Sequence, residues 1–255
     1  MIIKSKNIMV ESLYRSVIAA ADSTLVEDPD TIVVVGGDGC LLGVIKEYGL
    51  DKTYIPINAG NFGFLLNDVK VKQHSLDRLQ DRYVNILQSR SWMVQEFPIL
   101  TMTMDNGIVE SAVNDAYIER SSGQTVRVSI KIDGSILVEK MVCDGVIIST
   151  ALGSTGYNLS AGGPVVHPLN KNLIVTPSNA HSLSFTPMVL PGSSKIDIKA
   201  EDVEYRPVRF VADGRTYDDV KCAQIQYGNK QLRLGYFYGH NFTDRLVSKI
   251  LNKRH

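Results

Sequence analysis

The first third of the chain alternates between segments of extended and helical character. Residues 31–35 form an unbroken β-branched run that is typical of a buried strand, and 54–58 indicate a second, shorter strand. Residues 11–21 have a helix-like composition, 40–48 begin a helical pattern, and 75–89 carry apolar side chains at helical spacing. Alternation of this kind predicts a mostly parallel sheet with helices on its faces.

From Trp92 onward the period of the pattern changes to two, which is typical of strands with one buried face. Two such runs lead into turns of the hairpin type, one at Asp105-Asn106-Gly107 and one at Asp133-Gly134. Strands are expected at 101–104, 126–132, 136–138, 196–199, 208–211, 223–227 and 231–236, and a last helix at about 243–251. The second part of the chain is therefore predicted to be rich in β-sheet.

The predicted fold class is α/β followed by β. An N-terminal Rossmann-like α/β domain is expected at 1–92, with a C-terminal segment at about 240–255 packing back onto it. A β-rich, β-sandwich-like domain is expected at 93–239. At 255 residues the chain is long enough to give both domains a core.

The charge balance limits the class of partner. Lys plus Arg and Asp plus Glu each number 27, so the formal net charge is zero. A nucleic acid or an anionic membrane would favour a clear basic surplus, and neither is expected as a partner. The 44% hydrophobic and 21% charged content is ordinary for a soluble globular protein.

The cysteines and the N-terminus favour a cytoplasmic protein. Cys40, Cys143 and Cys222 are odd in number, far apart and in no metal-ligand spacing, as expected in a reducing compartment. The N-terminus lacks the layout of a signal peptide, and no apolar run approaches membrane-spanning length.

A glycine turn follows the first strand. Gly36, Gly37 and Gly39 surround Asp38 between a strand and a helical pattern, which is where free backbone N–H groups can hold a phosphate. Such a site gains nothing from an acid, so Asp38 suggests a bound metal or a proton to be removed. The alternative is an ordinary loop, in which Gly and Asp are common.

Three later segments are poor in core residues and rich in groups that bind ligands. The loop at 58–64 follows the second strand, so we expect it to share a crevice with the glycine turn. Asn114-Asp115 stands inside an apolar run, so at least one of the pair should point inward; a bulge or a turn at a strand end is the alternative. The run from Cys143 to Pro164 combines hydroxyls, an amide and an aromatic ring, which suit a base and its sugar better than a flexible linker.

Taken together, these segments resemble the NAD kinases, which use ATP to phosphorylate the adenosine ribose 2′-hydroxyl of NAD and so make NADP. The resemblance rests on five blocks in the family's order: Gly36–Gly39, Asn58-x-Gly60-x-x-Gly63-Phe64, Asn114-Asp115, Asp144-Gly145 and Gly153–Pro164. A weaker match follows at 183–191, and the short N-terminus resembles the compact bacterial type.

The resemblance implies a role for each matching residue. Asp38 is the expected catalytic residue, which accepts the proton of the 2′-hydroxyl and contacts NAD. The expected site for the ATP phosphates is made by Gly36, Gly37 and Gly39, the last of which also contacts NAD. The other expected NAD-binding residues are Asn61, Phe62, Asn114, Asp115, Asp144, Thr155, Gly156, Tyr157, Asn158, Leu159, Ser160 and Asn179.

Within this set the resemblance assigns the ribose hydroxyls to Asn114 and Asp115, and the nicotinamide side of NAD to Asp144, in some members across a subunit boundary. It also implies a homodimer or homotetramer. Mg²⁺ or another divalent cation would accompany ATP, so no protein residue is assigned as a metal ligand.

The chain departs from the family pattern at four positions. Cys40 replaces a threonine, Gly156 an alanine, Asp115 the commoner glutamate, and Thr186 a frequent arginine. No catalytic group is lost by these changes.

Other functions fit fewer of the motifs. Diacylglycerol- and sphingosine-type lipid kinases share the glycine turn and a two-domain layout, and phosphofructokinases share the turn alone. A non-catalytic NAD(P)-binding sensor is a further alternative. No P-loop lysine is present, so backbone N–H groups and Mg²⁺ must neutralise the phosphates. His167 and His181 are weaker candidates for the base than Asp38.

Overall fold

The computed structural model describes residues 2–3, 30–58, 63–67, 85–181 and 185–251. They fall into two compact units, Met1–Phe97 with Leu232–His255 and Pro98–Gln231. The segment that returns to the first unit thus begins at Leu232, earlier than the position of about 240 expected from the sequence. The predicted helix at 11–21 lies outside the described residues. Of the one at 75–89 only 85–89 are described, with 85–88 as helix.

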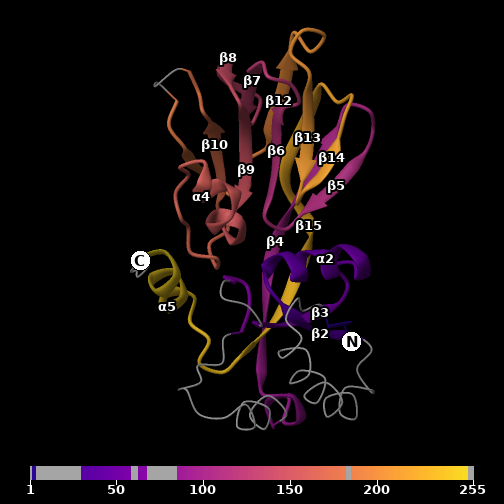
Figure 1. Cartoon of the computed structure of the whole chain (residues 1–255), viewed down its shortest axis with the longest axis vertical. Coiled ribbons are helices and arrows are strands. Elements are labelled where there is room, and N and C mark those ends of the chain that lie inside the picture. Colours follow the sequence, from indigo (N-terminus) through magenta and orange to yellow (C-terminus); the bar gives the residue numbers. More distant parts are fainter. Residues whose placement is uncertain (1, 4–29, 59–62, 68–84, 182–184, 252–255) are drawn as a thin grey trace. The chain divides into compact units, whose positions relative to one another are not determined.

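The first unit contains the predicted parallel sheet. Its strands are β1 (Ile2–Ile3), β2 (Thr31–Gly36), β3 (Thr53–Asn58) and the end of β15 (Cys222–Phe237), in the order β1-β2-β3-β15 and parallel throughout. Helix α2 (Asp38–Tyr48) follows β2 (Figure 1). It buries Leu41, Val44 and Ile45. The β-branched side chains of β2 are buried, which explains the unbroken apolar run in the sequence.

Aromatic rings secure the C-terminal segment of this unit. Phe97, Tyr236 and Phe242 meet edge to face with ring centroids 5.1–6.3 Å apart, and His240 stacks on Tyr236 at 4.0 Å. Helix α5 (Phe242–Leu246) begins beside this cluster, and the short π-helix η2 (Val247–Leu251) continues it, where the sequence predicted a helix.

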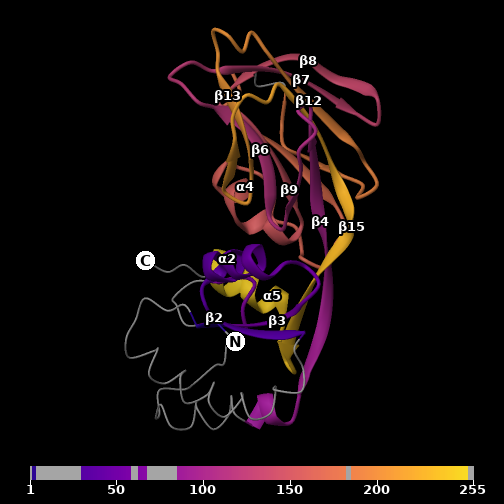
Figure 2. The same ribbon diagram turned by 90° about the vertical axis from the view of Figure 1, so that its right-hand side faces the viewer.

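The second unit is a sandwich of two sheets (Figure 2). One sheet has the order β11-β10-β9-β6-β13-β14 and is antiparallel throughout; the other runs from β15 through β12 and β7 to β8, with β4 pairing with β15 and β5. The bounds are β4 (Trp92–Met104), β5 (Val109–Ala112), β6 (Asp115–Arg120), β7 (Val126–Ile132), β8 (Ser135–Cys143), β9 (Gly145–Thr150), β10 (Leu173–Ser178), β11 (Met188–Leu190), β12 (Ile196–Glu201), β13 (Val208–Ala212) and β14 (Arg215–Tyr217). Two short helices, η1 (Leu152–Thr155) and α4 (Tyr157–Ser160), follow β9.

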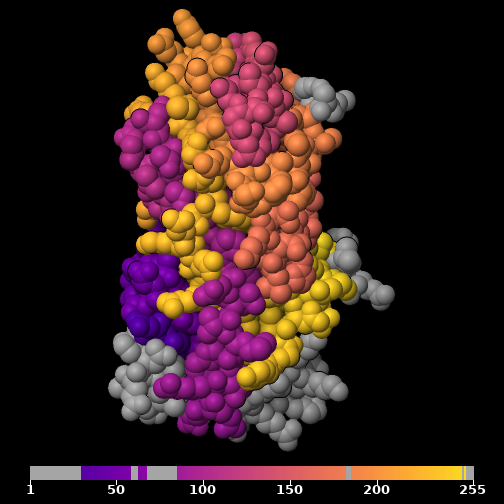
Figure 3. All heavy atoms as spheres, turned by 180° about the vertical axis from the view of Figure 1, so that it is seen from behind, coloured from indigo at the N-terminus to yellow at the C-terminus, as the bar shows by residue number. Residues whose placement is uncertain are grey.

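The core of this unit lies between the two sheets and takes the inward side chain of every second residue. In β7, for example, Val126, Val128 and Ile130 are fully buried. Both predicted hairpins form, and Asp133 and Gly134 have positive φ as a two-residue turn requires. The β7–β8 hairpin covers part of the face seen in Figure 3.

Two strands that the sequence predicted separately form one continuous strand. The expected strands at 223–227 and 231–236 are both part of β15, which continues through Gly228. A side chain at Gly228 would meet the Thr101 hydroxyl at 2.2 Å. The glycine therefore permits the close approach of β4 rather than a turn.

Candidate functional site

The glycine turn of the first unit is built as the sequence predicted. β2 ends at Gly36, Gly37 is extended at φ −104° and ψ 178°, and α2 begins at Asp38, two residues before the expected start. A side chain at Gly39 would meet no atom within 4 Å. Packing against the described residues therefore does not require glycine at that position.

Asp38 is held by the segment that follows β3. Its Oδ2 accepts the N–H of Phe64 at 2.8 Å and its Oδ1 accepts the N–H of Leu65 at 3.0 Å. The glycine turn and the end of the 58–64 loop are therefore in contact. A carboxylate offers about four acceptor positions, so two remain for a ligand. Asn61 and Phe62 lie outside the described residues.

The sequence reasoning missed the residues that support this segment. The buried Asn67 donates to the carbonyls of Pro56 and Gly235 at 2.9 Å and accepts the N–H of Phe237 at 2.9 Å. Arg245, also buried, donates to the carbonyl of Gly63 at 2.9 Å. Neither residue stands in a recognisable motif. Asn67 follows the apolar run 64–66, which is its only signal in the sequence, and Arg245 has no such signal.

In the second unit, Asn114 and Asp115 lie where β5 gives way to β6 rather than in the middle of one strand. The side chain of Asp115 is 7% exposed. Burial raises its pKa to about 7, and the neighbouring Asp213 carboxylate adds to the shift. Asn114 Oδ1 is buried with no hydrogen-bond partner among the described residues. A buried acceptor and a buried acid side by side are suited to ligand hydroxyls.

Asp213 is a further residue that the sequence reasoning missed. Its carboxylate accepts the N–H groups of Val113, Asn114 and Asp115 at 2.6, 2.9 and 3.3 Å, and its own N–H donates to the Asp115 carbonyl. Burial raises the pKa of Asp213, opposed by these three bonds. The sequence signal at this position is the Asp213-Gly214 pair, which is typical of a hairpin turn. The turn does form, with positive φ at both residues.

The Gly153–Pro164 run packs directly against the Asn114-Asp115 pair. A side chain at Gly153 would lie 2.1 Å from the carbonyl oxygen of Asn114, so only glycine fits. The Thr150 hydroxyl donates to the Val113 carbonyl at 2.8 Å and accepts the Gly153 N–H at 2.9 Å. These contacts bring together two motifs that are about forty residues apart in the chain.

Members of this run differ in their exposure. Gly156, Tyr157 and Ser160 are exposed, and Thr155 and Leu159 are half-buried. Asn158 is fully buried: its amide donates to the carbonyls of Ser154 and Pro164 at 3.0 and 2.9 Å, and its carbonyl oxygen accepts the Thr176 hydroxyl at 2.7 Å. Asn158 thus fixes the shape of the loop from within.

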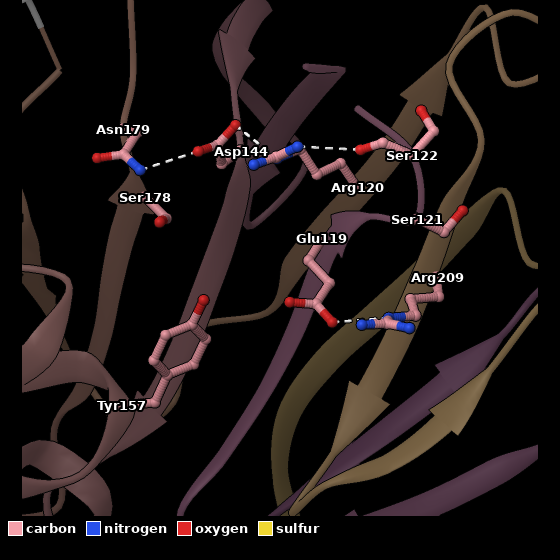
Figure 4. Close-up of a pocket in the computed structure, with 9 residues that line it drawn as sticks. All are labelled: Glu119, Arg120, Ser121, Ser122, Asp144, Tyr157, Ser178, Asn179 and Arg209. Carbon is pink, nitrogen blue, oxygen red and sulfur yellow. Dashed lines mark hydrogen bonds and ion pairs between the residues drawn. The ribbon is translucent and has the colours of Figure 1, made fainter. Parts of the chain in front are cut away.

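A polar cavity of about 430 Å³ opens beside this loop (Figure 4). Asp144 accepts from Arg120 Nε at 2.9 Å and from Asn179 Nδ2 at 2.8 Å, and Arg209 pairs with Glu119 at 2.7 Å. The lining residues are Glu119, Arg120, Ser121, Ser122, Asp144, Tyr157, Ser178, Asn179 and Arg209. Three residues predicted from the sequence (Asp144, Tyr157 and Asn179) therefore share one cavity.

The ring of Tyr157 forms one wall of this cavity. It meets the ring of Tyr117 edge to face, with centroids 5.0 Å apart, and burial raises the pKa of both hydroxyls, that of Tyr117 to about 12. Both therefore stay protonated at neutral pH and remain donors. No group of three or more His, Cys, Asp or Glu side chains suited to a metal ion occurs in the described part of the chain. Nor do its helices include one long and apolar enough to cross a membrane.

Comparisons with known proteins agree on one family. The family model described as the ATP-NAD kinase C-terminal domain matches residues 113–227. A protein named NAD kinase from Caldicellulosiruptor bescii is 34% identical over 228 residues, covering 87% of this chain and 82% of that protein. Another NAD kinase, from Brucella suis, is 31% identical over 88% of this chain and 85% of its own length.

Solved structures show the same fold. Yeast NADH kinase, determined with NADH, superimposes with a TM-score of 0.78 at 22% identity, over 99% of this chain and 86% of that one. The NAD kinase from Archaeoglobus fulgidus, determined with ATP, gives 0.75 at 23% identity, over 96% of both chains. The predicted fold class, an α/β domain followed by a β-rich one, is confirmed.

Proposed function

The chain belongs to the NAD kinase family and acts as an NAD kinase, and from that premise we propose how its residues divide the work of phosphorylating the adenosine ribose 2′-hydroxyl of NAD. The observation that carries the proposal is the position and hydrogen bonding of the Asp38 carboxylate. A carboxylate at the start of a helix, directly after a glycine turn, is fixed by two backbone N–H groups and keeps acceptor positions for a hydroxyl.

Asp38 accepts the proton of the 2′-hydroxyl as the phosphoryl group is transferred. Phosphoryl transfer passes through a loose, anionic transition state, so positioning and charge neutralisation contribute most of the rate. The helix N-terminus and the backbone of Gly36, Gly37 and Gly39 hold the ATP phosphates. The open space next to Gly39 supports this assignment.

A divalent cation, Mg²⁺ in the first instance, accompanies ATP. Mg²⁺ usually keeps several waters and is bound through substrate phosphates plus one or two carboxylates. The partly exposed Asp38 carboxylate, with acceptor positions to spare, fits such a cation. The cation neutralises charge on the phosphates when it is bound.

NAD is held by the residues of the second unit. The Asp115 carboxylate and the unpartnered Asn114 Oδ1 accept the ribose hydroxyls. The surface of the loop beside them contacts the adenine and phosphates through Thr155, Gly156, Tyr157, Leu159 and Ser160, while Asn158 acts from inside the loop. Asp144 and Asn179 contact the nicotinamide side. Asn61 and Phe62 stay predictions from the sequence.

We also propose a cytoplasmic location and a homodimer or homotetramer. No two of the three cysteines are joined by a disulfide, as expected in a reducing compartment. Light scattering of the purified protein measures the assembly directly: a mass near 56 or 113 kDa is expected, from the 28.2 kDa chain, and a mass near 28 kDa contradicts the assembly.

The experiment that tests the function offers the purified protein several acceptors with ATP and Mg²⁺. NAD should be consumed and its product should be oxidised by an NADP-specific dehydrogenase, while diacylglycerol and sphingosine should remain unphosphorylated. Tight NAD binding without product would instead identify a sensor, and phosphorylation of a lipid alone would identify a lipid kinase.

A further inference from the structure

The clearest feature outside the residues already assigned is the buried guanidinium of Arg245. It comes from α5 near the C-terminus, is 7% exposed, and its Nη1 donates to the carbonyl of Gly63 at 2.9 Å. An arginine buried to this extent is costly unless it is hydrogen-bonded, so its position is not accidental. The fold brings residue 245 to residue 63 by way of β15.

The bond that Arg245 makes lies one peptide group away from Asp38. The carbonyl of Gly63 and the N–H of Phe64 belong to the same planar peptide group. That N–H donates to Asp38 Oδ2 at 2.8 Å. The chain of bonds therefore runs from the guanidinium to the peptide carbonyl, and from the peptide N–H to the carboxylate. A charged donor on the carbonyl strengthens the N–H as a donor, because consecutive hydrogen bonds polarise one another.

The C-terminal segment also contacts Leu65, the residue that gives Asp38 its second N–H. The Tyr236 hydroxyl donates to the Leu65 carbonyl at 3.0 Å, and the Leu65 N–H donates to Asp38 Oδ1 at 3.0 Å. Burial raises the pKa of Tyr236, so its hydroxyl stays a donor. Tyr236 in turn packs edge to face on Phe242, the first residue of α5. The C-terminal segment thus holds the Gly63–Phe64 peptide group through Arg245. Through Tyr236 it also holds the Leu65 carbonyl, which belongs to the peptide group after the one that donates to Oδ1.

We propose that Arg245 is a positioning residue for catalysis, which acts on Asp38 through the Gly63–Phe64 peptide group. This inference rests on the proposed function of Asp38 as the proton acceptor. It assigns to α5, which lies about 200 residues away in sequence, a share in the reaction and not merely in stability.

The test is a double-mutant cycle on kcat. Arg245→Met keeps an unbranched apolar stem but removes the guanidinium with its charge and donors. It should lower kcat about 10- to 100-fold, the scale on which misplacement of a catalytic group is felt, with the KM for NAD changed less than about 3-fold. Arg245→Lys should recover part of the loss. In the Asp38→Asn background, Arg245→Met should lower the residual kcat by less than about 3-fold, because the group it positions is gone.

Asn241→Ala is the matched control. It removes the cap of α5, whose side chain accepts the N–H groups of Thr243 and Asp244, but leaves the donor to Gly63 in place. If Arg245 had only a structural role, an Asn241→Ala variant with the same melting temperature as Arg245→Met would lose as much kcat as Arg245→Met does. The losses from Arg245→Met and Asp38→Asn would then also multiply in the double variant. Either result overturns the inference. If Asp38→Asn itself keeps wild-type kcat, the proposed function of Asp38 fails instead.

Discussion

The buried carboxyl of Asp115 should cost the protein stability at the pH at which it serves to bind NAD. Its pKa is raised from 3.8 to about 7, chiefly by burial and then by Asp213. The folded chain therefore holds a proton there more tightly than the unfolded chain, and the free energy of unfolding falls as the pH rises through that window. A shift of about three pKa units, at 1.36 kcal/mol each, lowers the free energy of unfolding by about 4 kcal/mol once the pH is above both pKa values.

Replacing Asp115 by asparagine keeps the size of the side chain and removes this cost. We expect Asp115→Asn to be about 2–4 kcal/mol more stable than the wild type at pH 8, which raises the melting temperature by about 4–16 °C in a chain of this length. At pH 5 the gain should shrink by more than half, since the wild-type carboxyl is then largely protonated in the fold. Asp133→Asn, at an exposed turn, is the control and should show neither effect.

The same substitution should weaken NAD binding. A carboxylate that accepts ribose hydroxyls makes charge-assisted bonds of about 1.5–3 kcal/mol, so calorimetry at pH 8 should show a loss of about 10- to 150-fold for NAD and little change for ATP. A variant no more stable than the wild type at pH 8 would refute the account of a buried, destabilised carboxyl. An equal loss of ATP affinity would refute its assignment to NAD.

Four other variants have expected outcomes. Asp38→Asn should lower kcat about 10²- to 10⁴-fold, the usual contribution of a positioned general base, while NAD still binds; a variant with half of the wild-type kcat would show the role to be wrong. Gly153→Ala should destabilise by about 1–3 kcal/mol and impair NAD binding, because its methyl group would meet the Asn114 carbonyl at 2.1 Å. Gly156→Ala is the comparison: its nearest contact is 3.2 Å, so a melting temperature within a few degrees of the wild type is expected. Asp144→Asn should change stability by less than about 1 kcal/mol, since its ion pair is partly exposed, yet raise the KM for NAD; an unchanged KM would remove it from the site.

Features that depend on local sequence were predictable. The β-branched run at 31–35 became β2, the glycine turn became the N-terminus of α2, and the Asp133-Gly134 pair became a hairpin turn. Each is decided by backbone preferences within a few residues. The break expected between 227 and 231 does not form: β15 continues through Gly228, whose lack of a side chain allows the close approach of β4.

The supporting residues of the site could not be predicted, because their partners are distant in sequence. Asp213 lies about 100 residues from the N–H groups that it accepts, and Arg245 about 180 residues from Gly63. Nothing near either residue distinguishes it from an ordinary turn aspartate or a helical arginine. Only the folded chain shows that one of them holds the proposed ribose site and the other the peptide group beside Asp38.

The central claim, that Asp38 serves an NAD kinase reaction, is tested most directly by following NADP formation with an NADP-specific dehydrogenase. Wild type and Asp38→Asn are compared at saturating ATP, Mg²⁺ and NAD, with NAD occupancy measured by calorimetry. The account predicts steady NADP formation by the wild type and a rate at least about 100-fold lower for the variant at equal occupancy. Equal rates, or no NADP from a wild type that binds both substrates, would contradict it.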